Sequence, residues 1–163
     1  MENNDILIRL RYALDIKNTD MVKIFGLGGV EVSKDEVLQM LQKPKDYMEE
    51  EDDSLLKCND RKLESFLNGL IVFKRGKQDP KPGQPEFPPP SKESVNNLLF
   101  KKVKIALALT SDDILGMMED AGVNMSKGEL GAILRKEGQK NYKECGDKFA
   151  RNFLKGLTMR YRE

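Results

Sequence analysis

The chain contains the same stretch of sequence twice, and this constrains its fold more than any other feature. The segment GGVEVSKDEV at 28–37 returns as AGVNMSKGEL at 121–130. At an offset of 93 positions, residues 3–43 align with residues 96–136 without a gap. Because the matches keep one order and occur only twice, the sequence predicts a tandem duplication rather than a longer array of repeats.

The alignment divides the chain into two repeats and a linker. After the insertion 44–57 in the first copy it resumes at an offset of 87, where 58–76 matches 145–163. Each copy has only about 70 residues, which is marginal for an independent core, so the two are expected to pack together. The predicted units are a helical repeat at 1–75, a Pro-rich linker at 76–93 and a second helical repeat at 94–163.

The linker GKQDPKPGQPEFPPPSKE holds six of the seven prolines of the chain. Proline has no backbone N–H and a fixed φ, so this segment cannot lie inside a helix and favours an extended path. Its P-x-x-P spacings, Pro82 with Pro85 and Pro85 with Pro88, would also suit docking on an aromatic groove. A stiff spacer explains the same composition.

Each repeat has its apolar residues at the spacing of four amphipathic helices. In the first helix of each copy, for example, Leu7 and Leu10 match Phe100 and Val103. No alternating β-branched run long enough for a sheet appears, so the predicted fold is all-α. The expected helices are roughly 4–16 and 97–109 after an Asn cap, a second pair opening after Asn18 and Ser111, a third pair following the repeated turn, and a fourth pair at roughly 60–74 and 147–161.

The repeated turn has the spacing of a helix capping box. Ser33 is followed three residues later by Glu36, and Ser126 by Glu129, so each pair can satisfy free N–H groups at the start of a helix. A lysine follows each serine, Lys127 in the second copy, although the helix dipole disfavours a cation there. A helix start with a serine and a lysine can bind an anion. Ser126 and Lys127 are therefore predicted anion-binding residues, and capping alone is the alternative.

Two pairs of matched glycines predict backbone geometry. Gly29 and Gly122 precede the repeated turns and suit the left-handed end of a helix. Gly69 and Gly156 fall inside the fourth helices, where glycine costs about 1 kcal/mol relative to alanine. Because both copies keep this glycine, we expect a neighbouring helix to cross closely there.

The sequence lacks the usual machinery of catalysis. It contains no histidine, which excludes Ser-His and Cys-His catalysis and imidazole metal sites. It has no Walker loop, dinucleotide-binding glycine pattern or EF-hand loop, and the acidic run EEEDD at 49–53 lacks the alternation of a calcium loop. Cys58 and Cys145 are expected to be reduced core thiols, with a regulatory disulfide as the alternative. We therefore predict no catalytic residue, no metal site and no cofactor.

Charge is unevenly divided between the copies, although the net charge is only +1. Residues 1–75 carry 12 basic and 15 acidic side chains, whereas residues 94–163 carry 13 and 9. On a helical wheel, cations of the last helix fall on one arc opposite the apolar stripe, with no acid between them. They are Lys148, Arg151, Lys155 and Arg162. Such an arc can contact the phosphates of nucleic acid, and a solvated helix face is the structural alternative.

The segments NNDILIRLRYAL, FLNGLIVFKRGK, LTSDDIL and KNYKECGDKFARNFLKGL resemble the YehS-like family of uncharacterised bacterial proteins, a tandem-repeat domain of unknown function. The resemblance covers nearly the whole chain, and its motifs are long. It implies a fold of two repeats and a bacterial cytoplasmic setting, and it supplies no site residues. The chain departs from the family in the acidic insertion 44–57 before Cys58.

Together these features predict a non-enzymatic binding module. Its leading partner is nucleic acid, contacted by the basic second repeat. The alternative is a protein–protein adaptor whose acidic first half and basic second half engage different partners. In that case the basic half would bind an acidic protein. No apolar run is long enough to span a membrane, and MENND does not begin a signal peptide. We therefore expect a cytoplasmic protein without a membrane partner.

Overall fold

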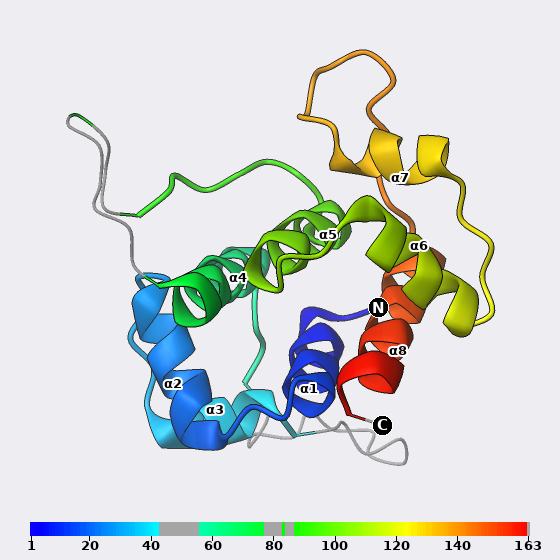
Figure 1. Cartoon of the computed structure of the whole chain (residues 1–163). Coiled ribbons are helices and arrows are strands. Elements are labelled where there is room, and N and C mark those ends of the chain that lie inside the picture. Colours follow the sequence, from blue (N-terminus) through cyan, green and yellow to red (C-terminus); the bar gives the residue numbers. More distant parts are fainter. Residues whose placement is uncertain (43–55, 77–82, 84–86, 163) are drawn as a thin grey trace, which may run out of the picture.

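The computed structural model describes residues 1–42, 56–76, 83 and 87–162, and within them the chain folds into eight helices and no strand. The prediction of an all-α fold is confirmed (Figure 1). Each repeat supplies four helices. They are α1 (Asn3–Ala13), α2 (Asn18–Leu27), α3 (Lys34–Met40) and α4 (Asp60–Arg75), then α5 (Val95–Ala106), α6 (Ser111–Asp120), α7 (Lys127–Leu134) and α8 (Asp147–Tyr161).

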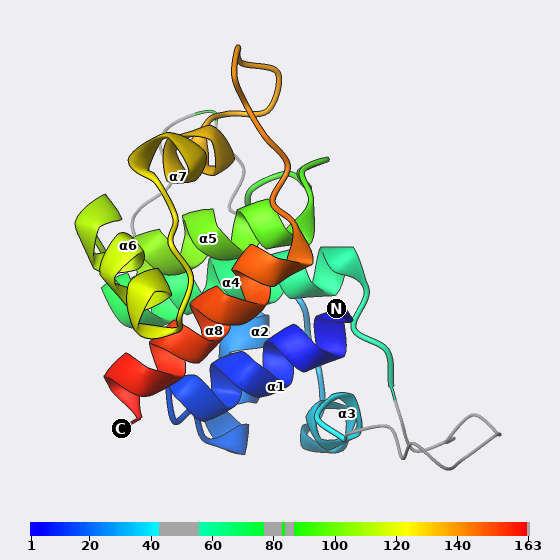
Figure 2. The same cartoon turned by 90° about the vertical axis from the view of Figure 1, so that its right-hand side faces the viewer.

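The two repeats pack reciprocally. The last helix of the first repeat, α4, lies against α5, the first helix of the second repeat, and α8 lies in turn against α1. These four helices form the centre of the molecule, with α2 and α3 on one side and α6 and α7 on the other (Figures 1 and 2). Each repeat therefore completes its packing with a helix of the other, as the short length of a single copy predicts.

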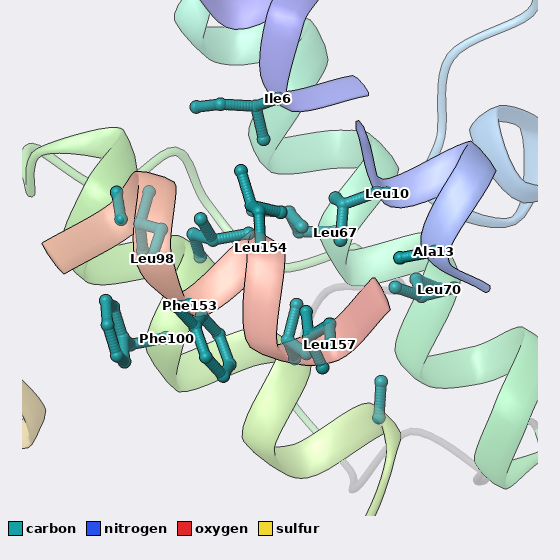
Figure 3. Close-up of a cluster of buried hydrophobic side chains, with 14 of the residues drawn as sticks. Ile6, Leu10, Ala13, Leu67, Leu70, Leu98, Phe100, Phe153, Leu154 and Leu157 are labelled. Atoms are coloured by element: carbon teal, nitrogen blue, oxygen red, sulfur yellow. The ribbon is translucent and has the colours of Figure 1, made fainter. Parts of the chain in front are cut away.

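The core runs through both repeats without a break. Figure 3 shows side chains of α1, α4, α5 and α8 meeting at the centre, among them Leu10, Leu67 and Leu154. One aromatic pair anchors each repeat: the ring centroids of Phe25 and Phe66 are 5.0 Å apart, and those of Phe100 and Phe153 are 4.3 Å apart. Burial of this shared apolar surface holds the repeats together.

The predicted capping boxes are present in full. Ser33 accepts from the backbone N–H of Glu36, whose carboxylate accepts from the N–H of Ser33, and Ser126 and Glu129 do the same at α7. The structure adds a third box that the sequence reading missed, between Thr110 and Asp113 at α6. All three follow the S/T-x-x-acid spacing, in which an aspartate replaces the usual glutamate at α6.

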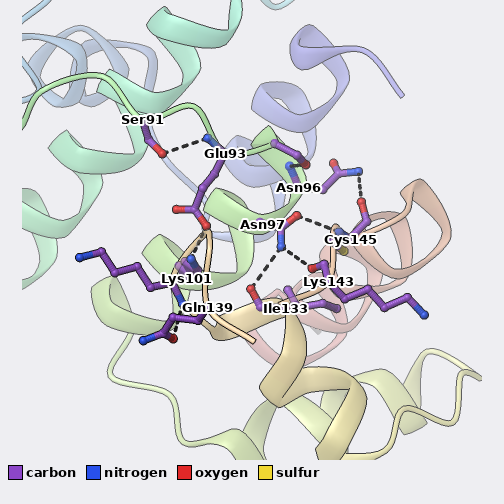
Figure 4. Close-up of polar contacts among 11 residues, drawn as sticks. Ser91, Glu93, Asn96, Asn97, Lys101, Ile133, Gln139, Lys143 and Cys145 are labelled. Atoms are coloured by element: carbon purple, nitrogen blue, oxygen red, sulfur yellow. Dashed lines mark hydrogen bonds and ion pairs between the residues drawn. The ribbon is translucent and has the colours of Figure 1, made fainter. Parts of the chain in front are cut away.

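The expectation of an Asn cap at the first helices was wrong. The Asn pairs lie inside α1 and α5, and their side chains hold the segment that follows the third helix. The amide of Asn97 donates to the carbonyls of Ile133 (3.2 Å) and Lys143 (2.9 Å) and accepts from the N–H of Cys145 (2.8 Å; Figure 4). Asn4 makes the equivalent bonds in the first repeat. A buried amide satisfied on all sides explains why both copies keep an asparagine here.

The matched glycines behave as predicted. Gly29 and Gly122 have φ values of +94° and +91°. A Cβ at Gly69 would overlap the carbonyl oxygen of Ile24 in α2, and one at Gly156 would lie 2.6 Å from the carbonyl oxygen of Met117 in α6. Both glycines therefore lie where a neighbouring helix crosses closely.

Parts of two sequence predictions lie outside the described residues, namely most of the acidic insertion 44–57 and the P-x-x-P spacings at Pro82 and Pro85. The end of the linker is described: Phe87 packs on Gly29, and Ser91 donates its N–H to Glu64 of α4. None of the described helices is long and apolar enough to cross a membrane.

Both cysteines are free and buried. Burial raises the pKa of the Cys58 thiol to about 11 and that of Cys145 to about 12. Both are therefore protonated at neutral pH, which leaves them without nucleophilic character.

Candidate nucleic-acid interface on α8 and α1

The sequence of α8 separates an apolar face from a basic one. Ala150, Phe153 and Leu157 are fully buried, and the intervening positions Lys148, Arg151 and Lys155 are exposed. Side chains three or four residues apart share one face of a helix. We call these three cations the α8 ridge. In the part of the chain that the structure describes, no salt bridge engages any of them.

Arg162, the fourth predicted member of this arc, is tied to α1. Its guanidinium donates to the backbone carbonyl of Tyr12 (3.1 Å) and to the carboxylate of Asp15 (3.0 Å). The same group lies 4.2 Å from the centroid of the Tyr12 ring, within the range of a cation–π interaction. Arg162 therefore joins the C-terminal ends of α8 and α1, a contact between residues 150 positions apart that sequence spacing could not reveal.

A groove runs between α1 and α8, which lie side by side in Figures 1 and 2. Its volume is about 920 Å³. Its lining combines apolar side chains with three cations and one acid. The lining residues are Ile8, Tyr12, Leu154, Thr158 and Met159, with Arg9, Arg11, Lys155 and Asp5.

Arg9 and Arg11 are candidate site residues that the sequence reading missed. Both lie on α1 and line the same groove as Lys155 of α8. Arg9 is exposed, whereas Arg11 donates to the side chain of Asn18 (2.8 Å). The count of charges in each repeat places α1 in the acidic first half of the chain. Only the packing of α1 on α8 brings its arginines to the basic surface.

The predicted anion site at the α7 turn is engaged in capping. The hydroxyl of Ser126 accepts from the N–H of Glu129, and the Lys127 ammonium lies 3.8 Å from Asp112, with both side chains largely exposed. Hydrogen bonds from Ser126 lower the pKa of Glu129 below its ordinary value. A carboxylate therefore already occupies the positive end of this helix. Glu129 and Lys148 line one pocket of about 370 Å³, which places the turn next to the start of the α8 ridge.

The equivalent contact between α4 and α5 has the opposite electrostatics. Glu64 of α4 stands at the repeat position of Arg151, and Lys102 of α5 at that of Arg9. Lys102 is partly buried, which lowers its pKa, and the negative charges of Glu64 and Glu93 oppose that shift. Glu93 also forms an ion pair with Lys101 (Figure 4). The cations of α5 are thus balanced by acids, whereas Arg9 and Arg11 of α1 share their groove with Lys155 of α8 and one acid, Asp5.

Comparison with known proteins places the chain in a family. The model of DUF1456, described as a protein of unknown function, matches residues 3–76 and again residues 96–163. The chain belongs to this family. The two matches fall on the two repeats.

The chain is also similar to the uncharacterized protein YehS of Escherichia coli (strain K12). It is 39% identical over 160 residues, which are 98% of this chain and 96% of that protein. The resemblance to the YehS-like family is therefore confirmed. No solved structure matches the chain.

Proposed function

We propose that this DUF1456 protein is a non-enzymatic protein that binds nucleic acid through the α8 ridge and the adjoining arginine of α1. The observation that carries the proposal is the arrangement of cations. Lys148, Arg151 and Lys155 are exposed on one face of α8, and Arg9 lies across the groove from Lys155. Among the described residues none of these four side chains is held in a salt bridge, so all four can contact phosphates.

The spacing of the cations suits a phosphate backbone. The ridge spans about 10 Å along the helix, since α-helices rise about 1.5 Å per residue. One strand of DNA carries a phosphate about every 3.4 Å of helix axis. The ridge therefore matches the length of a few consecutive phosphates, and Arg9 supplies a second contact beside it.

The α7 turn is an outer part of the same proposed surface. Lys127 and Asp112 are exposed at a distance of 3.8 Å, and such surface pairs contribute little to stability, so Lys127 can exchange Asp112 for a phosphate. Added phosphate should therefore raise the melting temperature of the parent more than that of Lys127→Ala. Equal responses would leave Ser126 and Lys127 with a capping role alone.

A protein–protein adaptor is the second candidate, because an acidic protein would satisfy the same cations. The apolar side chains exposed in the groove, Tyr12 and Met159, favour this alternative as well. For either partner we propose the cytoplasm as the place of action, since two free buried thiols suit a reducing compartment.

The test is a fluorescence anisotropy titration of labelled mixed-sequence DNA and RNA at 50 mM and 200 mM salt. We expect binding at 50 mM that weakens steeply with salt, because each neutralised phosphate releases condensed counterions. The triple variant Lys148→Glu, Arg151→Glu, Lys155→Glu should abolish binding without unfolding the protein, since these side chains point away from the core.

A matched control carries the same change of charge in the first repeat. Lys57, Arg61 and Lys74 are also exposed, and their replacement by glutamate should leave most of the binding intact. No salt-sensitive binding to either nucleic acid at 50 mM salt would refute the proposal and favour the adaptor.

A further inference from the structure

The groove between α1 and α8 has an apolar floor beneath its cations. Ile8 and Tyr12 of α1 and Leu154 and Met159 of α8 line it, and Tyr12 is 51% and Met159 36% exposed. Phosphate groups would not bind this apolar floor, because they bind charged and hydrogen-bonding groups. An apolar surface flanked by Arg9 and Lys155 suits a ligand that is anionic on one edge and flat and apolar on the other.

The duplicated fold does not by itself produce this open groove. At the equivalent contact, Leu98 of α5 is almost completely buried, and α4 packs more extensively on α5 than α8 does on α1. The α5 cations there are balanced by Glu64 and Glu93. Asp5, which lines the α1–α8 groove, replaces Leu98. On α8, exposed Arg151 replaces buried Glu64. The second contact therefore differs from the first in both shape and charge.

We infer that the α1–α8 groove takes the unpaired bases of single-stranded nucleic acid, an inference that rests on the proposed function. Base faces pack on aromatic and apolar side chains with little sequence preference, while a basic margin follows the backbone. A duplex keeps its base faces stacked inside, so it would contact the α8 ridge and leave the groove floor unused. Charge complementarity selects an anionic polymer, and the exposed floor selects one with accessible base faces.

Arg162 prepares the floor for this role. Its guanidinium lies over the Tyr12 ring and donates to Asp15, which holds the ring in one position at the end of the groove. Tyr12 nevertheless remains half exposed. An aromatic ring that is fixed before binding loses little conformational freedom when a base packs against it.

The experiment compares one labelled 20-nucleotide DNA as a single strand and as a duplex at 50 mM salt. The parent should bind the single strand about tenfold or more tightly than the duplex, since a base contact of this kind is worth about that factor. The double variant Tyr12→Ser, Met159→Ser should lose that preference and keep its duplex affinity within about twofold.

The repeat offers a matched control. Ile105 and Val72 stand at the positions equivalent to Tyr12 and Met159, and Ile105 is likewise 51% exposed. The variant Ile105→Ser, Val72→Ser should bind both forms as the parent does. Circular dichroism melting checks that each variant folds, and the single-strand preference of the parent is a test that needs no variant.

The outcomes separate the two proposals. Equal binding of single strand and duplex, still dependent on the α8 ridge, would overturn the groove inference and keep the proposed function. An unchanged preference in the Tyr12→Ser, Met159→Ser variant would overturn the inference as well. Binding of an acidic amphipathic peptide with no binding of either nucleic acid would overturn both and support the adaptor.

Discussion

The helices α4 and α8 occupy the same place in the two repeats, but they differ in how closely other elements pack on them. α4 packs more closely than α8 both on the second helix of its own repeat and on the first helix of the other. It carries buried Glu64, which accepts the N–H of Ser91 from the linker. α8 carries exposed Arg151 at that position.

The two helices thus differ in how far their outward positions are covered: Glu64 of α4 is buried, whereas Arg151 of α8 is exposed. The inward stripes are alike, since Phe66 and Leu67 match Phe153 and Leu154 and all four are buried. The outward positions have diverged. At one of them α4 has an acid, Glu64, and α8 has a cation, Arg151. Duplication thus keeps the core and leaves a basic outer face of α8 exposed.

The largest expected effect comes from the helix crossings. Gly69→Ala would push a Cβ into the carbonyl of Ile24, whereas Gly156→Ala would place one 2.6 Å from the carbonyl of Met117. We expect Gly69→Ala to cost about 3 kcal/mol in the free energy of unfolding and Gly156→Ala about 1–2 kcal/mol, as overpacked positions do. Urea denaturation measures both. Equal losses, or a larger one at Gly156, would contradict the tighter packing of α4.

The next effect concerns the position where the two helices differ in charge. Glu64→Ala should cost about 2–3 kcal/mol in the free energy of unfolding, because it leaves the N–H of Ser91 unpaired and removes one of the two negative charges that favour partly buried Lys102. Arg151→Ala should change stability by less than about 0.5 kcal/mol, as exposed substitutions do. Glu64→Gln keeps an acceptor for Ser91 and should fall between the two. A loss at Arg151 as large as that at Glu64 would contradict the contrast between the buried position on α4 and the exposed one on α8.

A smaller effect is expected at the capping boxes of α3 and α7, where the two repeats should behave alike. Ser33→Ala and Ser126→Ala each remove the serine of a complete capping box, and each should cost about 1 kcal/mol of stability. Chemical denaturation of the two variants side by side measures this. A clearly larger loss at Ser126 would show that the α7 turn contributes more than capping.

The smallest effect depends on pH and on the box found only in the second repeat. Hydrogen bonds from Thr110 hold the pKa of Asp113 below the ordinary value of 3.8. Its ionised form therefore stabilises the fold above that value, and the contribution is lost as pH falls through the lowered pKa. Asp113→Asn should lower the melting temperature at pH 7, and its difference from the parent should shrink as pH falls below 3.8. Asp20→Asn should have less effect, since α2 lacks a capping box. A difference between Asp113→Asn and the parent that does not shrink as pH falls would exclude this mechanism.

Local features were predictable because they depend on neighbours in the sequence. The helical spacing of apolar residues predicted the four helices of each repeat. The spacing of Ser126 and Glu129 predicted a capping box, which is present. The matched Gly69 and Gly156 predicted close crossings without showing which helix crosses. The Asn pair was misread as a cap, because the bonds of Asn97 run to residues 36 to 48 positions away.

The sequence by itself determined the duplication, the helical class and the inward face of each helix, because these follow from covalent order and helical period. Only the tertiary structure decided that α1 packs on α8 and α4 on α5. Hydrophobic burial is non-directional. An apolar stripe in the sequence therefore predicts that this face of the helix is buried, but it does not predict which helix covers it. That choice places Arg9 and Lys155 on one groove and ties Arg162 to Tyr12, and the groove of the candidate interface exists only because of it.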